Sequence, residues 1–458
     1  MYQEWESMKK RITAALLSLI ILLCTVIVFP NTQAKAAFAV DLDENQVYLD
    51  KVGAVFMINT DTGVTVYEKN CTEQMYPAST TKVMTALVAI ELCPDMNTMV
   101  TVDDRIADWL MGADASSSGL QGNERLSMYD LLCGLLMPSG NDAAFAIASF
   151  LGDGDVEKFV AYMNEKALLL GCVNTHFMNP HGLHEEGHYT CARDLAIISQ
   201  KAMEYPVFAE IVQKYSYTTA PSNKAPNGHT YYNTNYLMNV NYSSTYYYSY
   251  CKGIKTGYTS KAGMCFVGYA TRNGYNYICV CLGAPKTELY GGDEKYNASF
   301  ITCKELFDWA FNNLSLKEVV SANTVMAEVT LEQAWNKDAL TLVPETSFTT
   351  LLPSSVTGTA VMKKYDLPES VVAPVRKGDV VGTVTLSFAG DDLGTVNLVA
   401  SESVERSEIL YLLSIVNKIV SSTAFLIVAI LAVIAIGFYI VWSLVLGKNT
   451  GRKVRRYR

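Results

Sequence analysis

Two residues with complementary chemistry, Ser79 and Lys82, stand three positions apart in the run Ser79-Thr80-Thr81-Lys82. Residues three apart on a helix face the same side, so the lysine amine can reach the serine hydroxyl. A serine becomes a nucleophile when a neighbouring base removes its proton, and lysine can be that base when burial and a helix N-terminus lower its pKa. Alone, this spacing is common and usually marks a solvated helix start.

A second motif, Ser139-Gly140-Asn141, falls in a predicted loop between two helices. The Ser139 hydroxyl can relay a proton to a leaving group, and the Asn141 amide can bind both a substrate carbonyl and Lys82. The competing interpretation is an ordinary N-cap for the helix that begins at Asp142. We therefore give this motif weight only in combination with the others.

A third motif, Lys255-Thr256-Gly257, ends a predicted strand. A cation and a hydroxyl at this place can hold a substrate carboxylate, and Gly257 would let a substrate backbone approach closely. The competing interpretation is a basic strand end before a turn. The three motifs together predict an acyl-transferring serine enzyme with catalytic residues Ser79, Lys82, Ser139 and Asn141.

The elements around these motifs predict an α+β domain in which helices flank an antiparallel sheet. Short apolar runs bounded by turn residues predict strands, and Asn273-Gly274 predicts a two-residue hairpin between two of them. Helical periodicity and capping residues predict the helices, with Thr190 as the N-cap of one. The strands are expected near 54–58, 64–67, 254–256, 264–271 and 275–282, and the helices near 79–92, 126–137, 142–151, 155–170, 190–203 and 296–312.

Composition changes after Asn313, where short Val- and Thr-rich runs without cysteine predict a small all-β sandwich that carries no catalytic residue. The predicted organisation is a signal peptide, a catalytic domain, this β-rich domain, a helical linker, a transmembrane helix and a basic cytoplasmic tail. Their expected bounds are 1–36, 37–312, 313–400, 401–418, 419–447 and 448–458.

Both chain ends carry membrane signals. A basic cluster, an apolar run and Ala34-Lys35-Ala36 predict a cleaved signal peptide, with an uncleaved anchor as the alternative and Met8 as a possible start. The stretch 419–447 has no charged residue and exceeds the roughly 20 residues that cross a bilayer. Six basic residues follow it, which predicts a cytoplasmic tail and an extracellular catalytic domain.

The net charge of −9 argues against nucleic acid as a partner, because phosphate binding requires a basic surface. Ten of the eleven cysteines follow the signal segment, and several lie in apolar runs, so we expect mostly reduced, buried thiols. No Cys-x-x-Cys pair predicts zinc. His181, His184 and His188 lie within eight residues, but we interpret them as polar loop residues rather than metal ligands. No metal or cofactor is expected.

The three motifs, in this order, resemble the Ser-x-x-Lys, Ser-x-Asn and Lys-Thr-Gly set of penicillin-recognising enzymes. The wider text is similar to the serine-type D-alanyl-D-alanine carboxypeptidases, which are low-molecular-weight penicillin-binding proteins, over about 40–312 and more faintly to 400. The segments that carry this resemblance are Tyr76–Thr85, Pro138–Ala143, Asn179–Leu183 and Gly253–Thr259.

This resemblance implies a β-lactamase/transpeptidase-like catalytic domain that acts on peptidoglycan stem peptides ending in D-Ala-D-Ala. It implies attack by Ser79 on the penultimate carbonyl and an oxyanion hole made by the backbone N–H groups of Ser79 and Tyr258. It also implies that Lys255, Thr256 and Ser139 hold the terminal carboxylate, that Gly257 and Tyr258 contribute to substrate binding, and that β-lactam antibiotics acylate Ser79.

Two features depart from the family. Its members usually anchor through an amphipathic helix that lies on the membrane, whereas this chain is predicted to span it. The loop 233–237 resembles one that often carries arginine, and here it has none, so carboxylate recognition is expected to depend more on Lys255 and Thr256.

Two other functions compete. A class A-like β-lactamase requires a glutamate base between the second and third motifs, and the six candidates lack its local pattern. They are Glu157, Glu165, Glu185, Glu186, Glu204 and Glu210. A non-enzymatic penicillin sensor or wall-binding protein is the other alternative, but an eleven-residue tail is too short for a signalling domain.

Overall fold

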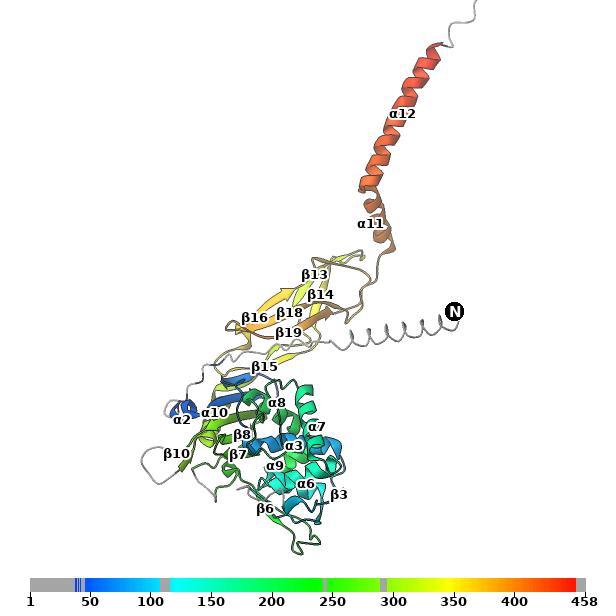
Figure 1. Ribbon diagram of the computed structural model, residues 1–458. Coiled ribbons are helices and arrows are strands. Elements are labelled where there is room, and N and C mark those ends of the chain that lie inside the picture. Colours follow the sequence, from blue (N-terminus) through cyan, green and yellow to red (C-terminus); the bar gives the residue numbers. More distant parts are fainter. Residues whose placement is uncertain are drawn as a thin grey trace, which may run out of the picture. The chain divides into compact units, whose positions relative to one another are not determined.

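The computed structural model describes residues 38, 40, 42, 46–107, 116–241, 245–288 and 295–449. The predicted signal peptide and nearly all of the predicted basic tail lie outside these residues. The chain forms two compact units (Figure 1). The first contains the chain up to Lys317 with 350–360 and 388–394, and the second contains 318–349, 361–387 and the chain from Thr395 onward.

The first unit is built on a five-stranded antiparallel sheet with the order β2-β1-β9-β8-β7. The strands are β1 (Ala54–Asn59), β2 (Thr65–Lys69), β7 (Cys251–Thr259), β8 (Gly263–Arg272) and β9 (Tyr275–Ala284). Strands β8 and β9 are joined by Asn273 and Gly274, whose φ angles of 54° and 85° suit a tight hairpin turn. This confirms the predicted hairpin. In the sheet order, β7 is an edge strand.

Both faces of the sheet are covered (Figure 1). Successive side chains of a strand point to opposite faces, so the sheet contributes to a separate core on each side. Ala54 and Phe56 join one hydrophobic core, and Val55 and Met57 join the other. The first core contains residues of α3 (Lys82–Leu92), α5 (Met128–Leu136), α6 (Asn141–Leu151), α7 (Val156–Leu169), α8 (Ala192–Met203) and α9 (Pro206–Gln213). The second contains residues of α2 (Gln46–Lys51) and α10 (Ala298–Asn313).

Helix α3 is surrounded by the first core. All of its residues from Lys82 to Ile90 are buried, which is the pattern of a central helix rather than a surface one. The predicted helix start at Ser79 is a separate 3₁₀ turn, η2 (Ala78–Thr81), which leads directly into α3. The nucleophile candidate therefore sits on a turn fixed to a helix that is buried along nearly its whole length.

One capping prediction is wrong. The N-cap of α8 is Cys191, whose Sγ accepts a hydrogen bond from the Asp194 backbone N–H. Thr190 instead pairs with Met75 through two backbone hydrogen bonds, so its segment is extended. This bridge joins the segment before α8 to the segment before the nucleophile turn.

The ten described cysteines are free thiols and all are buried, as expected from their apolar surroundings. Three of them, Cys279 and Cys281 on β9 and Cys303 on α10, bring their sulfur atoms within 4.8 Å of one another in the second core. Cys281 Sγ and Cys303 Sγ are 3.4 Å apart. These thiols pack β9 against α10.

Shorter elements complete the first unit. They are β3 (Met99–Thr101), β4 (Arg125–Ser127), β5 (Ser216–Thr218), β6 (Thr230–Tyr232), η3 (Tyr236–Met238), β10 (Lys286–Glu288) and β11 (Lys295–Asn297). After α10 the chain enters β12 (Leu314–Val320), which pairs with β15 (Phe348–Pro353). A short 3₁₀ turn, η4 (Gly358–Ala360), follows β15.

The second unit confirms the predicted all-β domain. Its six-stranded sheet has the order β16-β18-β19-β14-β13-β17. The strands are β13 (Ala327–Glu332), β14 (Ala339–Pro344), β16 (Met362–Asp366), β17 (Ser370–Val372), β18 (Val380–Phe388) and β19 (Asp391–Ala400).

Two helices follow this sheet, α11 (Glu408–Val420) and α12 (Thr423–Asn449). The predicted linker helix thus begins and ends later than expected, and the break between the helices falls at Ser421 and Ser422. Among the described residues, one segment, Thr423–Leu444, is long and apolar enough to cross a membrane.

Candidate active site

The turn that carries Ser79 is held by two threonine hydroxyls. Thr80 Oγ1 donates to the Pro77 carbonyl at 2.6 Å, and Thr81 Oγ1 donates to the Ala78 carbonyl at 2.8 Å. Ala78 has a φ of 48°, a left-handed conformation that costs energy for a residue with a Cβ. The two threonine bonds help to keep the chain in this conformation and so fix the direction of Ser79.

Lys82 is completely buried and its Nζ lies within hydrogen-bonding distance of three oxygen atoms. They are Ser79 Oγ at 2.9 Å, Asn141 Oδ1 at 2.7 Å and the His181 carbonyl at 2.7 Å. Burial lowers the pKa of Lys82 well below its usual range, and the charge of Lys255 acts in the same direction while Asp142 opposes it. The geometry thus supports the predicted pairing of Ser79 with Lys82.

The same three contacts also fit the neutral amine that remains when Lys82 loses its proton. A neutral amine has two N–H groups and one lone pair, and both Asn141 Oδ1 and the His181 carbonyl can only accept hydrogen bonds. They therefore take the two N–H groups, and the lone pair is left to receive the hydrogen bond of the Ser79 hydroxyl. This is the arrangement that a lysine acting as a base requires.

Ser139 lies in the loop between α5 and α6 with a φ of 66°. Its Oγ is buried and has no hydrogen-bond partner among the described residues. The following glycine is required, because a Cβ at Gly140 would lie 2.5 Å from Asp142 Oδ1 and 2.8 Å from the Gly134 carbonyl. The loop is thus compact, and it leaves the Ser139 hydroxyl available for another group.

Sequence reasoning missed the role of Asp142, which follows the second motif. This buried carboxylate accepts hydrogen bonds from the hydroxyls of Ser117 and Ser118. It also accepts from backbone N–H groups of Ser118, Gly119, Leu120 and Ala143. Asp142 therefore fixes the segment 117–120 to the start of α6, directly beside Asn141.

The third motif lies on edge strand β7, whose outer side has no partner strand in the sheet. Thr256 Oγ1 is 2.6 Å from Thr234 Oγ1, so two hydroxyls meet at this edge. Lys255 is buried and its Nζ donates to the Thr256 carbonyl at 3.0 Å. Burial lowers the pKa of Lys255 to about 7. Lys255 therefore stands behind Thr256, instead of facing solvent.

Gly257 has a packing role in addition to the predicted one. A Cβ at this position would lie 2.9 Å from Ser79 N, 3.0 Å from Thr80 N and 3.1 Å from Ala78 Cβ. The backbone that approaches Gly257 is thus that of the nucleophile turn itself. A glycine is needed so that β7 can pack against η2, and the next residue, Tyr258, lines the same cavity as Ser79.

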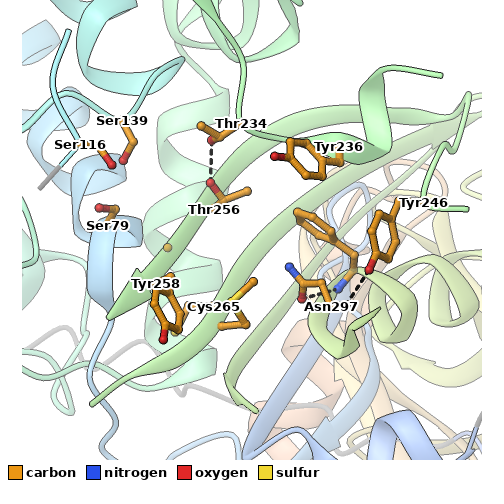
Figure 2. A pocket seen from close by; sticks show the side chains of 13 residues that line it. Ser79, Ser116, Ser139, Thr234, Tyr236, Tyr246, Thr256, Tyr258, Cys265 and Asn297 are labelled. Carbon is orange, nitrogen blue, oxygen red and sulfur yellow. Dashed lines mark hydrogen bonds between the residues drawn. The ribbon is translucent and has the colours of Figure 1, made fainter. Parts of the chain in front are cut away.

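These elements enclose a cavity of about 590 Å³ (Figure 2). Ser79, Ser116 and Ser139 gather at one end, and Tyr236, Tyr246 and Asn297 lie at the other. Thr234 and Thr256 meet between these ends. The remaining lining residues are Gly257, Tyr258, Met264, Cys265 and Phe300. Lys82, Asn141 and Lys255 are not lining residues and act from behind the wall.

The structure thus brings together all eight predicted site residues and adds several that the sequence did not reveal. Thr234 belongs to the loop 233–237, which the sequence singled out only for its lack of arginine, and the flanking pair Asn233 and Asn235 was a signal for an ordered loop. Both asparagines are buried and hold the loop, since Asn235 Nδ2 donates to the Gly253 carbonyl at 3.1 Å. Tyr246 and Phe300 contact each other edge-on and extend the cavity with an aromatic wall.

Comparison with known proteins identifies the family of the chain. Residues 32–286, more than half of the chain, match the family model described as D-alanyl-D-alanine carboxypeptidase of peptidase family S11. Residues 315–406 match the model of the C-terminal domain of penicillin-binding protein 5.

Individual relatives are also D-alanyl-D-alanine carboxypeptidases. The chain is 29% identical over 353 residues to the D-alanyl-D-alanine carboxypeptidase DacF of Bacillus subtilis, covering 77% of this chain and 85% of that protein. It is 37% identical over 237 residues to DacB2 of Mycobacterium tuberculosis, covering 51% and 74%.

Solved structures lead to the same family. Penicillin-binding protein 5 of Haemophilus influenzae matches with a TM-score of 0.62 and 28% identity, covering 78% of this chain and 98% of that one. The Streptomyces K15 DD-transpeptidase matches with a TM-score of 0.51 and 29% identity, covering 57% and 97%. The resemblance inferred from the motifs is confirmed: the chain belongs to the D-alanyl-D-alanine carboxypeptidase family, peptidase family S11.

Proposed function

We propose that this protein is a serine D-Ala-D-Ala carboxypeptidase that removes the terminal D-alanine from peptidoglycan stem pentapeptides. The observation that carries the proposal is the buried Lys82 amine, whose Nζ lies 2.9 Å from Ser79 Oγ and is also held by two carbonyl acceptors. Once this amine is neutral, its lone pair faces the Ser79 hydroxyl. The relatives named above are carboxypeptidases and a DD-transpeptidase, which matches acyl transfer at this serine.

In the first step Lys82 takes the proton of Ser79 Oγ, and the oxygen attacks the carbonyl carbon of the penultimate D-Ala. The backbone N–H groups of Ser79 and Tyr258 stabilise the resulting oxyanion. The close packing of Gly257 on Ser79 N and Thr80 N supports this pair of donors, because it brings β7 and η2 together.

The C–N bond then breaks, and the amine of the leaving D-Ala receives a proton through the Ser139 hydroxyl. Ser139 suits this relay because it lines the cavity with Ser79 and its Oγ has no partner among the described residues. Asn141 keeps Lys82 in place by accepting its hydrogen bond at 2.7 Å. Water then hydrolyses the ester on Ser79, which releases the shortened peptide and restores the hydroxyl.

The terminal carboxylate of the substrate is held at the Thr234–Thr256 pair and Ser139. Lys255 contributes its charge from behind Thr256, since it is buried and bonds the Thr256 carbonyl. This arrangement needs no arginine from the loop 233–237. β-Lactam antibiotics present a similar carboxylate and carbonyl, so they acylate the same serine.

The alternatives receive less support. None of the six glutamates considered for a β-lactamase lines the cavity, and Glu185 is engaged by Asn179 Nδ2 at 3.2 Å. A wall-binding scaffold would not need the Ser79–Lys82–Asn141 arrangement to be intact, whereas a penicillin sensor would keep it and differs from the enzyme in lacking turnover.

The protein is proposed to be anchored in the cell membrane with its catalytic unit outside. The apolar segment Thr423–Leu444 has 22 residues, which at about 1.5 Å each spans the roughly 30 Å hydrocarbon core. The preceding helix α11 exposes apolar residues at helical spacing, which suits the membrane surface. They are Ile409, Leu412, Leu413, Val416, Ile419 and Val420.

The test uses the full chain in detergent micelles with a pentapeptide muropeptide. The proposal predicts release of free D-Ala and labelling by a fluorescent penicillin, both lost in Ser79→Ala. Rapid hydrolysis of penicillin without D-Ala release would favour a β-lactamase, and labelling without either turnover would favour a sensor.

A further inference from the structure

His188 lies away from the cavity but is tied to the nucleophile turn by one hydrogen bond. Its Nε2 is 2.9 Å from Thr81 Oγ1, and its Nδ1 accepts the backbone N–H of Met178 at 3.0 Å. The ring is buried and meets Phe177 edge-on. Neither nitrogen lines the cavity, so His188 is not placed to touch a substrate.

The direction of these hydrogen bonds is fixed by chemistry. Since Met178 N–H points at Nδ1, that nitrogen must carry a lone pair, and the ring proton resides on Nε2. The Thr81 hydroxyl has one hydrogen, which it donates to the Ala78 carbonyl at 2.8 Å. Thr81 Oγ1 therefore accepts from His188 Nε2–H. The result is a one-way chain from Met178 through His188 and Thr81 to the carbonyl before Ser79.

The carbonyl at the end of this chain belongs to Ala78, the residue in the left-handed conformation. The segment 179–183 packs against the same carbonyl, because a Cβ at Gly182 would lie 1.9 Å from Ala78 O and 2.8 Å from Thr81 Oγ1. Asn179 braces that segment, with its Oδ1 accepting the Gly182 N–H at 2.8 Å. The segment also supplies the His181 carbonyl that accepts from Lys82 Nζ.

His188 thus connects the two backbone pieces that Lys82 must touch at once. Through Met178 it holds the segment that carries the His181 carbonyl, and through Thr81 it holds the turn that carries Ser79. We propose that His188 and Thr81 are positioning residues that keep Ser79 Oγ and the His181 carbonyl at hydrogen-bonding distance from Lys82. This inference rests on the proposed function and adds that the reaction requires the hydrogen bond between His188 and Thr81.

The chain offers a matched pair of substitutions at Thr81. Thr81→Val keeps the shape but removes the hydroxyl, which leaves the Ala78 carbonyl and His188 Nε2–H without their partner. Thr81→Ser keeps the hydroxyl. If the pair positions the nucleophile, Thr81→Val lowers kcat for D-Ala release and the rate of acylation by a fluorescent penicillin by up to about 100-fold, with KM little changed. Thr81→Ser remains close to the natural protein.

The two hydrogen bonds of His188 can be removed separately by substitution. The amide of glutamine reaches the place of Nε2 and can donate to Thr81, whereas that of asparagine reaches only the place of Nδ1. Glutamine thus keeps the contact with Thr81 but loses the acceptor for the Met178 N–H, and asparagine does the reverse. Because the link needs both contacts, we expect His188→Gln and His188→Asn each to lower the acylation rate. His176→Gln is the control, because His176 Nδ1 bonds only the Gly187 carbonyl at 2.9 Å in the same region.

All variants are assayed as full chains in micelles, with urea denaturation to establish that each is folded. Thr81→Val acylating within about threefold of the natural protein would overturn the inference, as would equal losses in Thr81→Val and Thr81→Ser. If His188→Asn does not fold, the comparison of Thr81→Val with Thr81→Ser still tests the inference. Failure of the natural protein to release D-Ala, with Ser79→Ala as reference, would refute the proposed function instead.

Discussion

Replacing Gly257 with alanine tests how the third motif meets the nucleophile. The new Cβ would lie 2.9 Å and 3.0 Å from the backbone nitrogens of Ser79 and Thr80, and 3.1 Å from Ala78 Cβ. Ordinary contacts of carbon atoms are about 3.5–4.0 Å, so strand β7 and turn η2 must separate by about 0.5 Å or more. We expect crowding of this kind to cost about 1–3 kcal/mol of stability.

The larger effect is expected on catalysis. The separation moves the Tyr258 N–H away from the Ser79 N–H, and both are proposed to bind the oxyanion. A displacement approaching 1 Å can cost about 100-fold in rate, so acylation by a fluorescent penicillin should fall by about this factor. The measurement is the second-order acylation rate constant, compared with the free energy of unfolding in urea.

Gly268→Ala is the matched control. Its Cβ would lie 2.8 Å from Phe266 Cε1 and 3.1 Å from Phe307 Cε2, which is similar crowding on β8, with aromatic rings in place of the nucleophile turn. We expect a comparable loss of stability with acylation preserved. If Gly257→Ala acylates as fast as Gly268→Ala at equal stability, the reasoning about this contact is refuted.

Three further outcomes follow from the same geometry. Lys82→Arg should abolish D-Ala release at every pH, because a guanidinium stays protonated, whereas the natural enzyme should lose kcat as pH falls and Lys82 takes up a proton. Asp142→Asn should leave about two buried donors unpaired and cost about 2–6 kcal/mol in urea denaturation, whereas the exposed cap variant Asp155→Asn should cost under about 1 kcal/mol. Burial and the neighbours His176, His184 and Lys82 lower the pKa of His188 to about 4 from 6.5. The folded state therefore binds fewer protons than the unfolded chain, so this group should withdraw about 3 kcal/mol of stability as pH falls from 6.5 to 4, and His188→Gln should remove that share of the slope.

Much of the fold could be predicted because its signals are local. The hairpin at Asn273 and Gly274 and the long buried run of α3 each follow from a few adjacent residues. The capping of α8 could not be predicted, since both Thr190 and Cys191 can cap, and the choice depends on the distant pairing of Thr190 with Met75.

The candidate site also combines local signals, which can be read from the sequence, with contacts between distant residues, which cannot. Ser79 and Lys82 are three residues apart and could be paired from helix geometry alone. The contact of Gly257 with the nucleophile turn joins residues far apart in the chain, and so does the His181 carbonyl that accepts from Lys82. Asp142 was overlooked because its six donor groups come mostly from a segment without any motif.

The ten buried thiols can report local or global unfolding of the chain without an added label. A thiol reagent cannot reach a sulfur inside a packed core, so each alkylation event records a molecule, or a part of one, that has opened. The thiols are distributed over both cores, with Cys133 in the first and Cys279 in the second. Pulse alkylation read by mass spectrometry would therefore resolve whether the two faces of the sheet open together or one before the other.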